Sequence, residues 1–137
     1  MAAKVRRVDY FHTSAPDRPG EAYRLLASLS ELQVNLLAFS AVPTGPVKTQ
    51  LTLFPEDSAL LRSVAKKAQL ELDGPYPALL VQGDDEIGAL AAIHEQLFQA
   101  KVNVYAASAV TDGRGGFGYL IWVRPEDFEQ AAKTLGV

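Results

Sequence analysis

The chain repeats itself with an offset of 68 residues, and this repeat constrains the fold more than any other feature of the 137-residue sequence. The recurring residues include apolar positions that suit packing and a second set of Asp, Gly and Asn residues. The matched pairs include Asp17 with Asp85, Gly20 with Gly88, Leu29 with Leu97, Asn35 with Asn103, and Val42 with Val110. The offset then becomes 70, because the loop after Val110 is longer by two residues than the loop after Val42. We therefore expect one small structural unit, made twice.

Each copy shows the same order of predicted elements, read from apolar periodicity and from Gly and Pro positions. A strand precedes a helix, two strands joined by a Gly-containing turn follow, and a second helix begins at a proline. In the first copy the expected strands are 5–13, 34–42, 47–54 and 70–72, and the second helix is expected to begin at Pro55. In the second copy the expected strands are 78–81, 102–111 and 117–123, and the second helix is expected to begin at Pro125. This order predicts an α+β, ferredoxin-like βαββαβ fold in two tandem copies, with antiparallel sheets and the helices on one face.

The predicted boundaries place the first domain at 1–72, a linker at 73–77 and the second domain at 78–137. The linker is expected because 73–77 reads Asp-Gly-Pro-Tyr-Pro, a turn-forming composition. The second copy ends at Val137 and leaves almost no room for its last strand. Neither half would bury a large core alone, so we expect the copies to associate side by side.

Composition excludes several kinds of site. The chain has no cysteine, which excludes disulfides, thiolate metal sites and a cysteine nucleophile and agrees with a reducing cytoplasm. The N-terminus does not resemble a signal peptide, no apolar run is long enough to span a bilayer, and no basic stripe favours nucleic acid. The segment 113–118 matches the dinucleotide pattern G-x-G-x-x-G but precedes a predicted strand, so a hairpin turn is expected there. His12 and His94 each occur in one copy only, and we assign them neither catalysis nor metal binding.

The repeated polar residues need an explanation other than core packing. Asp17 and Gly20, like Asp85 and Gly88, lie in the turn from the first strand of a copy into its first helix, where main-chain N–H groups can receive a carboxylate. The alternative is that the aspartates cap these helices and the glycines relieve a tight turn. Asn35 and Asn103 each begin an otherwise apolar strand, where a side-chain amide can both donate to and accept from an α-amino acid. The alternative for them is a local hydrogen bond that closes the preceding turn.

The Asp-x-x-Gly turn at a helix start, followed after the helix by Val34-Asn35-Leu36 or Val102-Asn103-Val104, resembles the ACT domain family, and the resemblance covers nearly the whole chain twice. It implies βαββαβ modules that pair side by side and bind amino acids between the first loop of one module and the asparagine of its neighbour. The residues it implicates are Asp17, Gly20, Asn35, Asp85, Gly88 and Asn103. ACT domains commonly have glycine before the hydrophobic-Asn pair, whereas this chain has Gln33 and Lys101.

These observations predict a cytoplasmic regulatory module without a catalytic domain or cofactor, which binds an amino acid and acts on a partner enzyme in trans. Two alternatives stay open: a structural or interaction module with an empty pocket, and a small enzyme on the same fold. We expect a homodimer paired through exposed sheet edges. The sequence does not specify which amino acid binds, nor whether a site lies within one chain or between chains.

Overall fold

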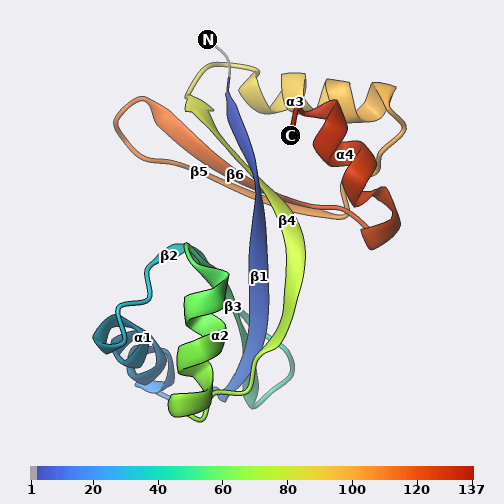
Figure 1. Cartoon of the computed structure of the whole chain (residues 1–137). Coiled ribbons are helices and arrows are strands. Elements are labelled where there is room, and N and C mark those ends of the chain that lie inside the picture. Colours follow the sequence, from blue (N-terminus) through green and yellow to red (C-terminus); the bar gives the residue numbers. More distant parts are fainter. Residues whose placement is uncertain (1–2) are drawn as a thin grey trace. The chain divides into compact units, whose positions relative to one another are not determined.

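The computed structural model describes residues 3–137, which form two compact units. The first unit is Asp9–Tyr76, and the second unit combines the N-terminal segment through Val8 with Pro77–Val137. Two long strands, β1 (Lys4–Pro16) and β4 (Asp73–Asp84), contribute to both units (Figure 1). The two units therefore do not correspond to the two halves of the sequence.

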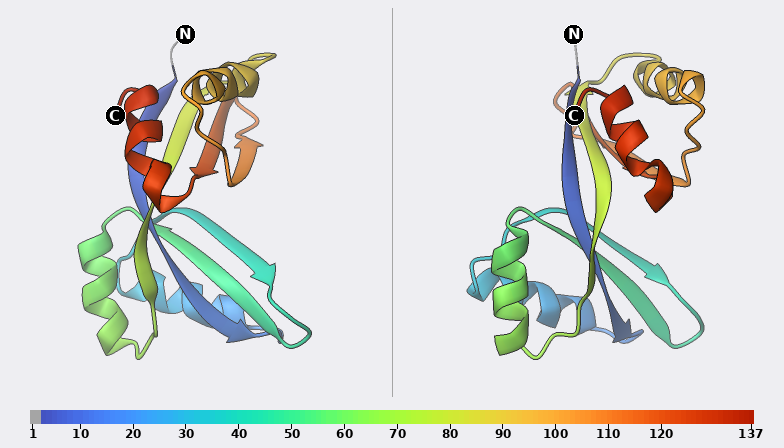
Figure 2. Two further views of the ribbon diagram at one scale, coloured as in Figure 1. Left: turned by 90° about the vertical axis from the view of Figure 1, so that its right-hand side faces the viewer. Right: turned by 45° about the vertical axis from the view of Figure 1, so that its right-hand side comes forward.

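The first unit contains the whole βαββαβ pattern in chain order. Its elements are the later part of β1, α1 (Glu21–Glu31), β2 (Leu36–Pro43), β3 (Lys48–Pro55), α2 (Ser58–Lys67) and the start of β4. Strand β3 pairs antiparallel with both β1 and β2, so that Phe11 lies opposite Leu53. Leu29 of α1 and Leu61 of α2 pack with these two residues in one core. Both helices therefore cover the same face of the sheet (Figure 2).

The second unit has the same pattern, but its last strand comes from the other end of the chain. Its elements are the later part of β4, α3 (Ala89–Gln99), β5 (Ala106–Thr111), β6 (Gly116–Trp122), a 3₁₀ turn (Pro125–Asp127), α4 (Phe128–Thr134) and the start of β1. Val5 of β1 packs against the core of this unit. Arg7 of β1 bonds to Glu129 at 2.9 Å and lies over the ring of Phe128. Lys4–Val8 thus supplies the last strand of the βαββαβ pattern in the second unit.

The strand order is β2-β3-β1-β4-β6-β5, and the α+β fold with six strands and four helices confirms the predicted fold class. Three local predictions were wrong. The predicted linker 73–77 lies within β4, where the apolar segment that follows continues the same strand. Residues 70–72 are not a strand, and the first unit closes instead with 73–76.

The third correction concerns the helices predicted to begin at prolines. Helix α2 begins at Ser58, after Asp57 accepts a hydrogen bond from the Leu60 N–H at 3.1 Å. Pro125 begins a 3₁₀ turn, and α4 follows from Phe128. Each proline is followed by an acidic pair, and Asp57 caps α2 with its side chain, whereas Asp127 precedes α4 without a side-chain capping hydrogen bond.

All four helices end in the same way, with one residue in the left-handed region. In α1 this residue is Gln33 (φ 64°), in α3 it is Lys101 (φ 60°), and in α4 it is Gly136 (φ 92°). The next N–H bonds back to a carbonyl five residues earlier, as Val34 does to Leu29 and Val102 to Leu97, both at 2.9 Å. This is the Schellman arrangement. Gln33 and Lys101 therefore adopt the backbone shape that glycine usually provides.

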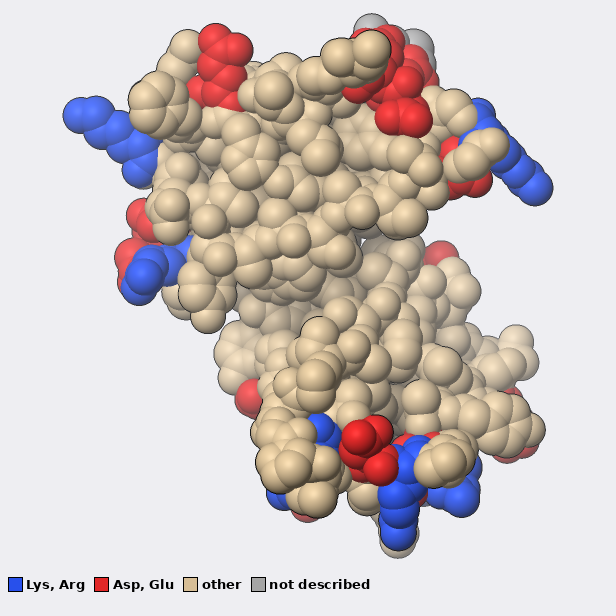
Figure 3. Space-filling model, turned by 180° about the vertical axis from the view of Figure 1, so that it is seen from behind, with Lys and Arg blue, Asp and Glu red and all other residues tan. Residues whose placement is uncertain are grey.

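None of the described helices is both long and apolar enough to cross a membrane. On the face in Figure 3, acidic and basic side chains lie mostly near the margins of each unit and are intermixed.

Candidate ligand-binding site

The repeated Asp-x-x-Gly turn has the same geometry in both units. Gly20 precedes α1 with φ 89°, and Gly88 precedes α3 with φ 84°, both in the left-handed region. The Asp17 N–H bonds to the Val47 carbonyl at 2.9 Å, and the Asp85 N–H bonds to the Gly115 carbonyl at 2.8 Å. Each turn is thus attached by its main chain to the hairpin loop beside it, and glycine is needed there for its positive φ.

The aspartates do not cap the helices. The cap positions are occupied by Gly20 and Gly88, and neither helix receives a side-chain hydrogen bond at its start. The capping alternative is therefore wrong for both turns. The main-chain N–H groups of the first turn of α3, such as those of Leu90 and Ala91, have no partner four residues earlier within the helix.

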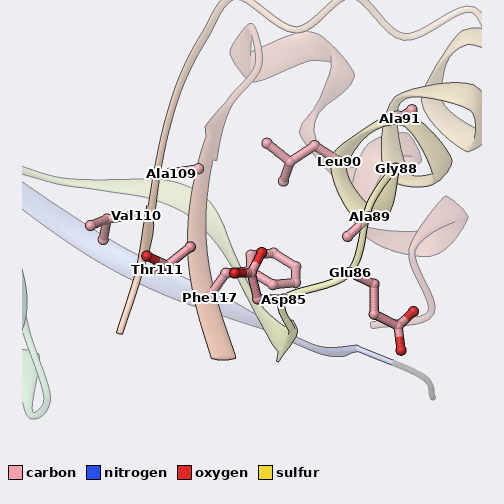
Figure 4. A pocket seen from close by; sticks show the side chains of 10 residues that line it. All are labelled: Asp85, Glu86, Gly88, Ala89, Leu90, Ala91, Ala109, Val110, Thr111 and Phe117. Carbon is pink, nitrogen blue, oxygen red and sulfur yellow. The ribbon is translucent and has the colours of Figure 1, made fainter. Parts of the chain in front are cut away.

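A cavity of about 350 Å³ lies at the start of α3, facing β5 and β6 (Figure 4). Its lining combines the predicted Asp85 and Gly88 with apolar and small side chains from the helix and the two strands. The lining residues are Asp85, Glu86, Gly88, Ala89, Leu90, Ala91, Ala109, Val110, Thr111 and Phe117. Leu90 extends from α3 toward the strands, and Asp85 and Phe117 both line the cavity. The volume is in the range of cavities that hold small metabolites.

The charge around this cavity is negative. Asp85 and Glu86 contribute carboxylates, and the lining contains no lysine, arginine or histidine. Asp112 follows Thr111 in the adjacent turn and accepts hydrogen bonds from the N–H groups of Arg114 at 2.6 Å and Gly116 at 3.0 Å. These hydrogen bonds, that from Arg114 first, lower the pKa of the Asp112 carboxyl. The arrangement suits a ligand with an ammonium group and an apolar body.

The corresponding position in the first unit is filled differently. With the offset of 68, Glu21 corresponds to Ala89 and Arg24 to Ala92. Glu21 Oε1 accepts hydrogen bonds from Arg18 at 2.9 Å and from Arg24 at 3.1 Å. These long side chains form ion pairs at the start of α1, where Glu21 and Arg24 line a separate cavity of about 260 Å³, whereas Ala89 lines the cavity at the start of α3. The two copies therefore share a backbone and differ in the room beside it.

The predicted asparagines lie far from the predicted turns of their own units. Asn35 precedes β2 near Pro55, whereas Asp17 lies beyond Pro16, which pairs with Lys48 at the opposite end of β3. The seven residue steps between these ends correspond to about 23 Å of strand. In the second unit, Asn103 lies near the Trp122 end of β6 and Asp85 near its Gly116 end, about 20 Å apart on the same measure.

Asn35 bonds to Glu56, 21 residues later, rather than to the preceding turn as its alternative required. Its side-chain amide donates to Glu56 Oε2 at 2.9 Å, and its carbonyl accepts from the Glu56 N–H at 2.9 Å. Asn103 is exposed. The structure thus brings Asp85 and Gly88 to one cavity, places Asp17 and Gly20 in the equivalent turn, and does not join either asparagine to a turn within its own unit.

Sequence reasoning missed the cavity walls, because it selected polar residues only. Ala89, Leu90, Ala109 and Phe117 are apolar and were expected to serve packing. One difference between the copies is visible in the sequence: alanines stand in the second copy at the positions that correspond to Glu21 and Arg24.

The two histidines lie in separate settings. His12 Nδ1 lies 3.0 Å from Thr52 Oγ1, and its ring packs edge-on against Tyr10. His94 Nε2 forms a short hydrogen bond with the Tyr119 hydroxyl, and burial raises the pKa of Tyr119. Within residues 3–137, His, Asp and Glu side chains do not form any group of three or more that could hold a metal ion.

The fold and the repeated turns define a protein of two ferredoxin-like βαββαβ units. No family model matches the chain. No curated protein matches it either. Among solved structures it is similar to protein BT0572 from Bacteroides thetaiotaomicron, with a TM-score of 0.76, 14% identity and coverage of 96% of this chain and 88% of that one.

It is also similar to the ligand-free regulatory subunit of aspartate kinase from Thermus thermophilus, with a TM-score of 0.63, 14% identity and coverage of 98% and 95%. The alpha and beta subunits of an aspartokinase give a TM-score of 0.58 at 17% identity, again with coverage of 98% and 95%. These likenesses concern the fold, and they extend over both units.

Proposed function

We propose that this protein is a non-catalytic regulatory module that binds an amino acid and acts on a partner protein. The observation that carries the proposal is the cavity at the start of α3, where the repeated turn of Asp85 and Gly88 meets an apolar wall. The fold similarity to the regulatory subunit of aspartate kinase from Thermus thermophilus supports a regulatory role. Small-molecule sites typically combine such an apolar lining with a few convergent polar groups.

An α-amino acid fits the chemistry of this lining. Its ammonium group would bond to the Asp85 carboxylate, and its carboxylate would accept from the N–H groups of Leu90 and Ala91 at the positive end of the helix. Its side chain would contact Ala109 and Phe117. Because the surrounding carboxylates repel anions, we expect apolar amino acids to bind and aspartate and glutamate not to bind.

A thermal-shift screen against the common amino acids tests this proposal. A ligand at about 100 times its Kd should stabilise the folded protein by about 2.7 kcal/mol. Asp85→Asn should weaken the shift, and Ala89→Glu, which introduces the side chain found at the equivalent position of the first copy, should abolish it. Asp17→Asn is the matched control in the first unit and should leave the shift unchanged. A flat screen with folded protein would contradict the proposal.

Under this proposal, Asn35 and Asn103 could contact a ligand only at the turn of a different module. Since Asn35 and Asn103 lie far from the turns of their own units, either could reach a turn only from another unit or another chain. We propose a homodimer paired at the sheet edges, because all six residues of β5 are exposed and uncharged and β2 is the other edge strand. Ser108→Lys in β5 and its repeat counterpart Ser40→Lys in β2 should each be compared with the unaltered chain by light scattering. If both variants keep the mass of the unaltered protein, this pairing is wrong.

The same edge favours the second candidate function, an interaction module without a ligand. That function predicts a dimer that is disrupted by Ser108→Lys together with a flat amino-acid screen. The two measurements therefore separate the candidates.

A further inference from the structure

A second cavity, of about 550 Å³, lies entirely within the first unit and is not connected with the repeated turns. It is formed by the middle of β1, one residue of β3 and the segment between α2 and β4. Its lining is polar apart from two leucines: His12, Thr13, Ser14, Gln50, Gln69, Leu70, Glu71, Leu72 and Asp73. Nothing in the amino-acid site described above uses these residues.

The cavity exists because β4 begins late. Gly74 is the second residue of β4, and a Cβ placed on it would lie 2.8 Å from the Tyr10 carbonyl oxygen and 3.3 Å from Phe11 Cα. The strand β1 continues to Pro16, whereas residues 70–72 have no strand conformation. The segment before Asp73 therefore runs beside β1 without forming a ladder, and space remains between them.

Two of the polar groups in this cavity are held in fixed positions. The His12 ring is positioned by the contact of Nδ1 with Thr52 Oγ1 at 3.0 Å and by Tyr10, whose ring centroid is 5.2 Å away. The Asp73 carboxylate accepts a hydrogen bond from the Tyr76 hydroxyl at 2.6 Å through Oδ1, and its second oxygen is not used in that bond. Groups held by their neighbours lose little conformational entropy when a ligand binds.

The charge of the lining selects the ligand. Glu71 and Asp73 are acidic, and the lining includes no lysine or arginine. Lys66 and Lys67 end α2 just before this segment but do not line the cavity. The remaining polar groups, the Ser14 hydroxyl and the Gln50 and Gln69 amides, can accept hydrogen bonds from ammonium groups.

We propose that this cavity binds a small hydrophilic organic cation that carries amino groups, such as an aliphatic diamine, with Glu71 and Asp73 as its charge partners. The site is independent of the proposed amino-acid function. Asp85→Asn should leave it unchanged, so the failure of one proposal does not imply the failure of the other.

The test is a titration of the unaltered protein with 1,4-diaminobutane at constant ionic strength, followed by the imidazole NMR signals. His94→Leu, which introduces the residue found at the equivalent position of the first copy, identifies the signal of His12. We expect a saturable shift of the His12 signal and none of the His94 signal. The uncharged analogue 1,4-butanediol should give no shift.

The double variant Glu71→Gln/Asp73→Asn should weaken diamine binding by about 10-fold, because each exposed ion pair contributes up to about 1 kcal/mol. Glu31→Gln, which removes an exposed carboxylate at the end of α1, is the matched control and should leave the affinity unchanged. The proposal is overturned if the His12 signal does not saturate, if 1,4-butanediol shifts it equally, or if Glu31→Gln weakens binding as much as the double variant. The comparison of the two probes needs no variant and decides the question even if the double variant does not fold.

Discussion

Replacing Val5 by aspartate should destabilise the second unit, although every other element of that unit lies after Tyr76 in the sequence. Val5 is half-buried and packs against the core cluster of β4, β6, α3 and α4. Its strand residues Lys4–Val8 complete the βαββαβ pattern of the second unit. A carboxylate at this position would be placed against apolar side chains.

Two terms set the size of the effect. Loss of the valine side chain from a partly buried position costs about 1 kcal/mol, and a poorly solvated carboxylate adds about 2 kcal/mol. The sum of about 3 kcal/mol corresponds to roughly a 100-fold increase in the opening equilibrium of the second unit. Hydrogen–deuterium exchange measured by peptide should detect this as lost protection in 77–84 and in α4.

Lys4→Gln is the matched control, because it changes the net charge by the same amount at an exposed neighbouring position. It should leave exchange almost unchanged. The reasoning is refuted if Val5→Asp leaves protection in 77–137 intact, if the loss is confined to 9–76, or if Lys4→Gln has the same effect.

Three further predictions concern backbone conformation and ionisation. Gln33→Gly and Lys101→Gly should each stabilise the protein by about 0.5–1 kcal/mol in thermal or denaturant unfolding, because glycine adopts positive φ without the penalty of a side chain; Gln33→Ala should give no such gain. Gly74→Ala should cost about 2 kcal/mol or more, since its φ is 140° and the new Cβ would meet a carbonyl oxygen at 2.8 Å; an unchanged midpoint would contradict that geometry. Burial raises the pKa of Tyr119, so its neutral form stabilises the fold below about pH 10 and this contribution is lost as the pH rises through the folded pKa. The unfolding free energy should therefore fall above about pH 10, less steeply in Tyr119→Phe than in the control Tyr105→Phe, whose ring is exposed.

The internal repeat predicted the fold because apolar periodicity and turn positions recur with a nearly constant offset. It did not predict that Lys4–Val8 joins the second unit, because the sequence of this segment does not indicate the unit against which it packs. Periodicity along β1 describes alternate faces of one strand. The identity of its neighbours depends on contacts between segments more than 70 residues apart, such as Arg7 with Glu129.

The candidate site was predicted in part for a similar reason. The turn of Asp85 and Gly88 was found from its repetition and lies at a cavity. The resemblance places beside this turn the asparagine of a neighbouring module, and within one unit α1 and α3 each carry the chain from one end of the sheet to the other before the asparagine is reached. A helix of 11 residues spans about 16 Å, so a residue that follows it cannot return to its start.

The two copies differ in the side chains that surround the repeated turn. The main chain of the turn has nearly the same conformation in both copies, as the φ values of Gly20 and Gly88 show. The first copy places a glutamate and two arginines at this turn, and Glu21 and Arg24 line a cavity of about 260 Å³ beside α1. The second copy places alanine at the positions of that glutamate and of the second arginine, and the first of these alanines, Ala89, lines the cavity that faces β5 and β6. The two copies therefore share the backbone of this turn and differ in the side chains around it: the cavity at α3 has a lining of mostly small and apolar side chains, whereas the one beside α1 includes a glutamate and an arginine.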